Sequence, residues 1–263
     1  MNLNNKTTMA TYKKRGGKPS TKTEKETSIE DGSTTAEVFN TLDESASRTE
    51  EWVIKNQKYI FIIVGLAAVL VLGFLGFDKF IQEPKEGQAT NDMFQSQQYF
   101  DQAVNGASKD SLFTLALNGA DGKYGFLDIA DVYSGTKAGN LSNYYAGMAY
   151  LNMKDYTNAV TYLNAFSSDD DILGPIAKGG IGDAFVQLEQ LEDAYDYYVQ
   201  AAQLKSNDYT TPMYLYKAGV IGLKLGNNSK ALGFFNQIKS DFPQSTEAKD
   251  IDVFIGKAEA ASN

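Results

Sequence analysis

The chain of 263 residues has no cysteine and no histidine, and it holds one tryptophan and five prolines. Without cysteine it forms no disulfide, thiolate zinc site or thiol nucleophile. Without histidine it lacks Ser-His-Asp triads, imidazole metal ligands and the side chain that most often moves protons near neutral pH. Enzymatic functions are reduced to carboxylate, lysine or tyrosine chemistry, and we expect no enzyme, cofactor or metal site.

Negative charge is concentrated in the later part of the chain. The formal net charge is −9, and residues 1–58 carry 10 Lys plus Arg against 9 Asp plus Glu, which leaves 14 against 24 for residues 59–263. An acidic surface repels nucleic acid and anionic lipid. We therefore expect no nucleic-acid partner.

One apolar run determines the expected topology. Residues 59–77, YIFIIVGLAAVLVLGFLGF, contain 19 positions without a charge. As a helix they would extend about 28 Å, close to the hydrocarbon thickness of a bilayer. A cleavable signal peptide is excluded by the long leader and by the missing small-x-small site. We expect a transmembrane helix over 59–80, the alternative being a buried helix of a globular core.

The rest of the chain divides around this run. We expect a disordered basic leader over 1–35, a juxtamembrane segment with the apolar spacing of an amphipathic helix over 36–58, a linker over 81–89 and a helical domain over 90–263. Basic residues predominate on the amino-terminal side, at Arg48, Lys55 and Lys58, and Lys79 and Lys85 follow the run. This excess predicts a cytoplasmic amino terminus and a carboxyl-terminal domain across the membrane.

The predicted outer domain repeats itself. Three glycines recur at offsets of 35 and 37 residues, each followed twelve positions later by alanine: Gly147 and Ala159, Gly182 and Ala194, Gly219 and Ala231. Small residues let two antiparallel helices approach closely, and such hairpins must stack to bury their apolar surface. The spacing predicts an all-α solenoid of helical hairpins.

The pattern resembles the tetratricopeptide repeat, which has small, aromatic and alanine positions at these offsets. The resemblance covers residues 141–243, with a carboxyl-terminal capping helix over 245–261. The early tryptophan of the repeat is absent, and Leu163 and Gly222 stand where aromatics are expected. Residues 90–133 are less regular and form either a divergent repeat or an amino-terminal cap.

Three short motifs suggest chemistry but have structural explanations. Residues 169–171 are three consecutive aspartates, which we interpret as a loop rather than a calcium site because the glycine and bidentate glutamate of an EF-hand are missing. Residues 179–182, GGIG, follow no strand, so we assign them to helix packing rather than phosphate binding. The acids at 189, 192 and 193 are interpreted as an exposed turn.

Two surfaces are candidates for binding. In solenoids of the resembled type the first helix of each pair lines the concave face, and abundant tyrosine favours protein contact. On that register the partner-binding residues are Tyr144, Met148, Asn152, Asp183, Gln187, Tyr216, Val220 and Lys224. The alternative for each is packing between repeats or simple solvent exposure.

The second candidate surface lies within the apolar run. Four small residues fall on one side of its helix: Gly65, Ala68, Gly73 and Gly76. Small residues allow close helix approach in lipid, so this side is a candidate docking face for another membrane protein. The alternative is a set of glycines exposed to lipid.

The whole layout resembles the YfgM type of membrane-anchored repeat protein, in the version found in Bacteroidota. The resemblance rests on Asn56-Gln57-Lys58-Tyr59 before the anchor, on YYAGMAYLNMKDY at 144–156 and on GDAF at 182–185. It implies an inner-membrane ancillary subunit of the Sec translocon, with the SecYEG channel, PpiD-type chaperones and translocated polypeptides as partners. A periplasmic scaffold for outer-membrane or cell-wall assembly is the alternative, and an enzyme using Asp or Glu is the third.

Overall fold

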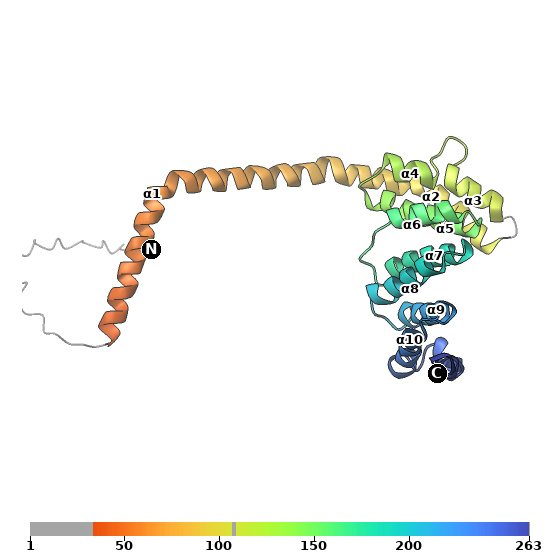
Figure 1. The fold of residues 1–263 in the computed structure, drawn as a ribbon. Coiled ribbons are helices and arrows are strands. Elements are labelled where there is room, and N and C mark those ends of the chain that lie inside the picture. The colour runs from red at the N-terminus through yellow and green to blue at the C-terminus, as the bar shows by residue number, and fades with distance from the viewer. Residues whose placement is uncertain (1–33, 107–108, 263) are drawn as a thin grey trace, which may run out of the picture. The chain divides into compact units, whose positions relative to one another are not determined.

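The computed structural model describes residues 34–106 and 109–262, with side chains from residue 49 onward except at Lys109. The expected leader over 1–35 lies almost entirely outside these residues. The chain divides into two units, residues 1–70 and 71–263. All regular structure in the described residues is helical, so the predicted all-α class is confirmed (Figure 1).

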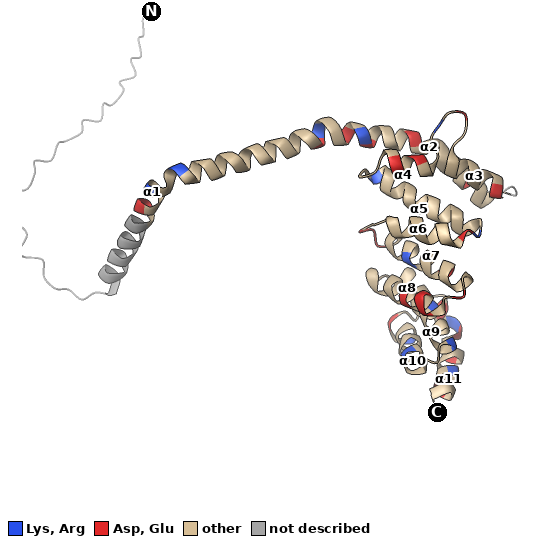
Figure 2. Ribbon diagram, turned by 45° about the horizontal axis from the view of Figure 1, so that its top comes forward, with Lys and Arg blue, Asp and Glu red and all other residues tan. Residues whose placement is uncertain are grey.

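Helix α1 (Thr34–Phe77) carries the apolar run. Its large apolar side chains, such as Leu70 at 64% exposure, are not covered by the described part of the chain. Figure 2 shows this uncharged stretch bounded by charged residues at both ends. Its most apolar window is entirely unburied by the described residues, and the helix is long and apolar enough to cross a membrane.

The expected linker over 81–89 is helical in the structure. A π-helical turn, η1 (Asp78–Gln82), leads directly into α2 (Glu83–Asn105). Pro84 lies in the first turn of α2, where its ring fits the helical backbone and a missing N–H costs little. Proline and glycine in this sequence therefore do not end the helix.

Polar side chains of η1 and α2 form hydrogen bonds to the start of α5 (Lys137–Asn152) and to the turn before it. The Glu86 carboxylate accepts hydrogen bonds from the backbone N–H groups of Lys137 at 2.6 Å and Ala138 at 2.9 Å. Gln82 Nε2 donates to the Gly135 carbonyl at 2.8 Å. A carboxylate at a helix amino terminus is also favoured by the helix dipole, so this segment is an integral part of the domain.

The first part of the domain is built on aromatic packing among α2, α3 (Lys109–Asn118), α4 (Phe126–Val132) and α5. Phe100 makes edge contacts with Phe113, Phe126 and Tyr145, at centroid distances of 5.4, 6.2 and 5.1 Å. Phe126 stacks on Tyr145 at 5.0 Å. Long-range packing thus stabilises the segment whose sequence is least regular.

Three helical hairpins follow. They pair α5 with α6 (Tyr156–Ala165), α7 (Leu173–Gln187) with α8 (Leu191–Leu204), and α9 (Thr210–Lys224) with α10 (Asn228–Asp241). In each hairpin the repeated glycine faces the residue 16 positions later. A Cβ on the glycine would lie 2.4 to 2.7 Å from that side chain in the pairs Gly147 and Leu163, Gly182 and Tyr198, Gly219 and Phe235.

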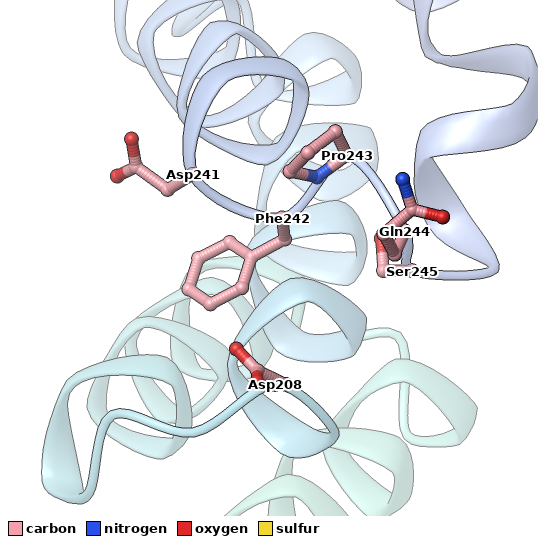
Figure 3. A pocket seen from close by; sticks show the side chains of 6 residues that line it. All are labelled: Asp208, Asp241, Phe242, Pro243, Gln244 and Ser245. Atoms are coloured by element: carbon pink, nitrogen blue, oxygen red, sulfur yellow. The ribbon is translucent and has the colours of Figure 1, made fainter.

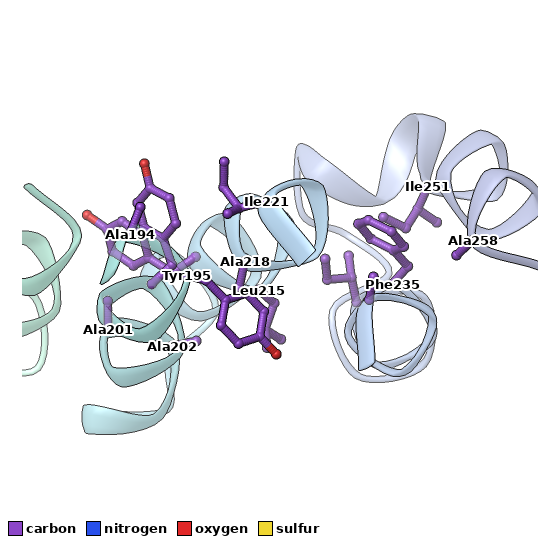
Figure 4. Packing of buried hydrophobic residues seen from close by; sticks show 14 residues of the cluster. Ala194, Tyr195, Ala201, Ala202, Leu215, Ala218, Ile221, Phe235, Ile251 and Ala258 are labelled. Carbon is purple, nitrogen blue, oxygen red and sulfur yellow. The ribbon is translucent and has the colours of Figure 1, made fainter. Parts of the chain in front are cut away.

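The last hairpin and the end of the chain share one core. Phe235, Ile238 and Ile251 are almost fully buried in it, and the cluster extends from α8 to α11 (Ile251–Ser262) (Figure 4). A short 3-10 turn, η2 (Glu247–Asp250), precedes α11. Helix α11 covers the apolar side that α9 and α10 would otherwise expose at the end of the stack.

The first helix of each hairpin ends in the same turn. Lys154, Glu189 and Gly226 occupy equivalent positions with φ of 65°, 60° and 76°. The residue after each donates its N–H to the carbonyl five positions earlier, at 2.8 to 2.9 Å. This 6→1 bond satisfies a terminal carbonyl, as in the Schellman motif, which favours glycine at the left-handed position.

Glu189→Gly is expected to stabilise the domain by about 1 kcal/mol, because a side chain with a left-handed backbone costs roughly that much. The melting temperature should rise by about 2 to 4 °C in a domain of this size. Thermal unfolding of the full chain in detergent measures the shift.

Gly226→Ala is the matched reverse change, and it should destabilise by a similar amount. A Cβ there meets nothing within 4 Å, so its cost is conformational alone. Equal melting temperatures for the two variants would contradict the assignment.

Candidate functional site

The aspartate run at 169–171 has a structural role in the described chain. The Asp170 carboxylate accepts hydrogen bonds from the backbone N–H groups of Ile172 and Leu173, both at 2.8 Å, at the start of α7. These bonds hold the pKa of the Asp170 carboxyl below its ordinary value. The described residues contain no group of three or more acidic side chains that could hold a metal ion.

The glycines of the GGIG segment lie against tyrosine and leucine side chains. A Cβ on Gly179 would lie 1.9 Å from Tyr214 Cε1, and one on Gly180 would lie 3.1 Å from a Leu163 methyl. Gly182 faces Tyr198. The segment is in the interior of α7, with helices on several sides, which agrees with a packing role and leaves no open loop for a phosphate.

Three neighbouring pockets follow the first helices of the hairpins and form one groove, which we call the A-helix groove. The first pocket, of about 430 Å³, lies between α5 and α7 and includes Lys154. The central pocket, of about 290 Å³, is lined by α7, α9 and α11. The third, of about 250 Å³, is lined by α9, η2 and α11. Adjacent pockets share residues, so the surface is continuous.

Six of the eight side chains predicted for partner binding line this groove. Asn152, Asp183 and Gln187 line the first pocket, and the other three line the central pocket: Tyr216, Val220 and Lys224. The structure therefore brings together residues that are separated by up to 72 positions in the sequence. That these residues bind a partner stays a prediction.

The remaining two predicted residues lie in the packing between hairpins. Tyr144 is half-buried and contacts Phe166 at a centroid distance of 5.2 Å. Burial raises the pKa of its phenol. Met148 packs in the same apolar cluster, against α7. Neither is among the residues that line the three pockets.

Sequence reasoning missed several residues of the groove. Val186 and Tyr198 line both the first and the central pocket, and Phe254 lines the central and third pockets. Val186 could have been found, since it follows Gly182 by four positions on one side of the same helix. Phe254 could not, because it belongs to α11, which follows the last hairpin.

A polar network crosses the floor of the groove. Asp183 Oδ1 accepts hydrogen bonds from the Tyr198 hydroxyl at 2.5 Å and from Lys217 Nζ at 2.6 Å. The Lys217 ammonium also lies 5.4 Å from the centre of the Tyr198 ring. Burial, and then the nearby Asp183 charge, raises the pKa of the Tyr198 phenol. The network joins three helices and leaves the floor electrically neutral.

Charges of opposite sign remain at the two ends. Lys154 lines the first pocket, and Lys224 lines the central pocket. Glu247 and Asp250 line the third pocket. Within the described residues, none of these four side chains is in an ion pair. They are therefore available to a ligand.

A separate pocket of about 260 Å³ lies between the α8–α9 and α10–η2 connections. Asp208 and Asp241 are two of its lining residues, and Figure 3 shows the Phe242 ring directed toward the loop that carries Asp208. Neither carboxylate has an ion-pair partner among the described residues. The pocket has no feature that indicates catalysis.

The candidate docking face of the apolar run is uncovered in the described chain. A Cβ placed on Gly65, Gly73 or Gly76 meets nothing within 4 Å, and Ala68 is exposed. The structure thus leaves room for an approaching helix on this side. It does not identify one.

Comparison with known proteins agrees with the hairpin geometry. The family model for the tetratricopeptide repeat matches residues 142–170 and 214–245. The chain contains tetratricopeptide repeats. The matched residues cover most of the first and last hairpins, and the α7–α8 hairpin between them has the same glycine contact, at Gly182 and Tyr198. No match was found among curated proteins or solved structures.

Tetratricopeptide repeats form scaffolds for protein contacts, and stacked repeats of this kind present extended binding surfaces. Protein partners are therefore the ligand class that the repeats indicate. The prediction that the chain is not an enzyme agrees with this repeat type and stays a prediction.

Proposed function

We propose that this protein is a single-span membrane scaffold whose A-helix groove binds segments of other polypeptides. The observation that carries the proposal is the groove itself, continuous over three pockets and lined by the apolar Val186, Val220 and Phe254. Apolar pockets with a few polar groups are typical of binding sites. Tyrosines at the pocket edges add contact area at low entropic cost.

The proposed topology has residues 59–80 in the bacterial inner membrane, the amino terminus in the cytoplasm and the repeats in the periplasm. It is supported by the exposed apolar helix and by the excess of basic residues before it. Gly65, Ala68, Gly73 and Gly76 are the proposed contact face for a neighbouring membrane protein. Close approach of helices in lipid requires such small residues.

The resemblance to the YfgM type extends this proposal to a cellular role. In that role the anchor contacts a SecYEG-type channel, and the repeats pass emerging polypeptides to periplasmic chaperones of the PpiD type. The arrangement of leader, anchor and repeats supports it. The scaffold function rests on the groove and stands independently of this role.

Photo-crosslinking in intact cells tests both parts. A crosslinking amino acid at Val220 is expected to capture translocated polypeptides, and one at Gly73 to capture channel subunits. The control position is Gln200, which is exposed on α8 and lines none of the groove pockets. Equal capture at Val220 and Gln200 would remove the groove as the binding site. Capture of outer-membrane or cell-wall assembly proteins would replace the translocon role by the alternative scaffold.

A further inference from the structure

The groove has an order of charges that restricts what it binds, if it binds polypeptides as proposed above. Lys154 lies in the first pocket, and Lys224, in the last turn of α9, lines the central pocket. Glu247 and Asp250 line the third pocket together with Tyr216. The groove therefore changes from positive, through apolar, to negative along its length.

The charges in the middle do not disturb this order. Asp183 and Lys217 are bonded to each other at 2.6 Å, so they cancel within the floor. The apolar side chains above them are Val186, Val220 and Phe254. A ligand thus meets the free Lys154 at one end, apolar side chains bordered by the free Lys224 in the middle, and free carboxylates at the other end.

The spacing of the pockets restricts the backbone of the ligand. The first and central pockets follow successive first helices of the hairpins, so they are displaced by about one packed helix, roughly 8 to 10 Å, and the third pocket adjoins the central one at Tyr216 and Phe254. A polyproline II chain turns once every three residues and rises about 3.1 Å per residue, so it returns a side chain to the same face every ~9 Å. A β-strand alternates faces, so its residues i and i+3 point to opposite sides.

We propose that the groove selects an extended segment with an acidic, a large apolar and a basic side chain at intervals of three residues. The acidic side chain binds at Lys154 in the first pocket, the apolar one enters the central pocket, which Lys224 borders, and the basic one binds at Glu247 and Asp250. The groove contacts the side chains of the segment and not its backbone. The segment therefore binds in either chain direction, provided that its three side chains reach these positions. Unfolded polypeptides offer such segments in exposed form.

Fluorescence polarisation with labelled nine-residue peptides and the full chain in detergent tests the proposal. The matching peptide has aspartate, phenylalanine and lysine at positions two, five and eight in an alanine and glycine background. Two controls carry either two aspartates or two lysines around the phenylalanine. The matching peptide is expected to bind about five to ten times more tightly at low salt, the amount that exposed ion pairs supply.

A fourth peptide tests the interval. It carries the aspartate and lysine two residues from the phenylalanine instead of three, and it is expected to lose most of the advantage. Equal affinity for both intervals would overturn the polyproline II geometry.

A charge-reversed protein gives the decisive comparison. Lys154→Glu with Lys224→Glu makes both ends of the groove negative, and this variant should prefer the peptide with two lysines. The control, Lys123→Glu with Lys230→Glu, has the same net charge but alters exposed residues outside the groove, and it should keep the original preference.

The failures of the two proposals are distinguishable. Equal binding of all peptides, to both proteins, would overturn the charge order and leave the groove as a binding site. If neither the peptides nor an unfolded polypeptide such as casein binds, the proposed function fails with it.

Discussion

Gly219→Ala is expected to lower the free energy of unfolding of the repeat domain by about 3 kcal/mol. The added Cβ would lie 2.4 Å from Phe235 Cε1 and 2.6 Å from Phe235 Cζ. Phe235 is fully buried, so its ring has no solvent side into which it could turn. Overpacking of a dense core typically costs 1 to 3 kcal/mol, and this contact is near the upper end because α9 and α10 must move apart. Chemical denaturation of the full chain in detergent measures the loss.

Gly233→Ala is the matched control, since it makes the same chemical change in α10 of the same hairpin. A Cβ at Gly233 meets nothing within 4 Å. Alanine is preferred to glycine in a helix by about 1 kcal/mol, so this variant should be more stable than the parent. The same substitution is thus expected to lower the stability at Gly219 and to raise it at Gly233.

A double-mutant cycle tests whether the stability lost in Gly219→Ala is caused by the collision with Phe235. Phe235→Ala removes the ring atoms that would collide, although it leaves a cavity that costs about 3 to 5 kcal/mol. In that background Gly219→Ala should cost less than about 1 kcal/mol. An undiminished cost would show that the Gly219 backbone, rather than its contact with Phe235, requires glycine.

Leu66→Arg combined with Leu70→Arg is expected to abolish membrane integration. Each replacement exchanges a leucine, which contributes about −0.5 kcal/mol to the free energy of membrane insertion near the bilayer centre, for an arginine, which costs roughly 3 kcal/mol. The pair therefore costs about 7 kcal/mol, a large part of what the apolar run supplies. Extraction of cell membranes with alkaline carbonate measures it: the parent should stay in the pellet and the variant should move to the supernatant.

The control for this experiment places two arginines in the repeats. Gln200→Arg with Gln203→Arg adds the same charge at exposed positions of α8, and the protein should remain in the pellet. If the arginine pair in the apolar run leaves the protein in the pellet as well, the run is not its anchor, and the proposed topology is wrong.

The hairpins were predictable because their determinants are local and periodic. Gly147, Gly182 and Gly219 each precede their buried alanine by twelve positions, and the structure places every one of these glycines against the second helix of its hairpin. Helix period and small residues at a crossing depend on nothing outside the hairpin. The family model accordingly matches two of the three.

The errors in the prediction arose where distant contacts override local signals. Proline and glycine at 84 and 87 predicted a linker, but this segment is helical and is held by two contacts: Gln82 donates a hydrogen bond to the turn before α5, and Glu86 accepts hydrogen bonds from the first N–H groups of α5. Local helix propensity cannot predict a hydrogen-bond partner that lies about 50 positions away in the sequence.

The sequence by itself determined the all-helical class, the repeated hairpin and the uncharged helix before it, since each follows from residue periodicity and hydropathy within a short stretch. Only the tertiary structure decided which side chains form the groove and which charges in it remain free. Asp183 and Lys217 are 34 positions apart, and α11 contributes Phe254 from beyond the repeats. The stacking of hairpins determines these contacts, because a helix face is buried or exposed according to which part of it the next hairpin covers.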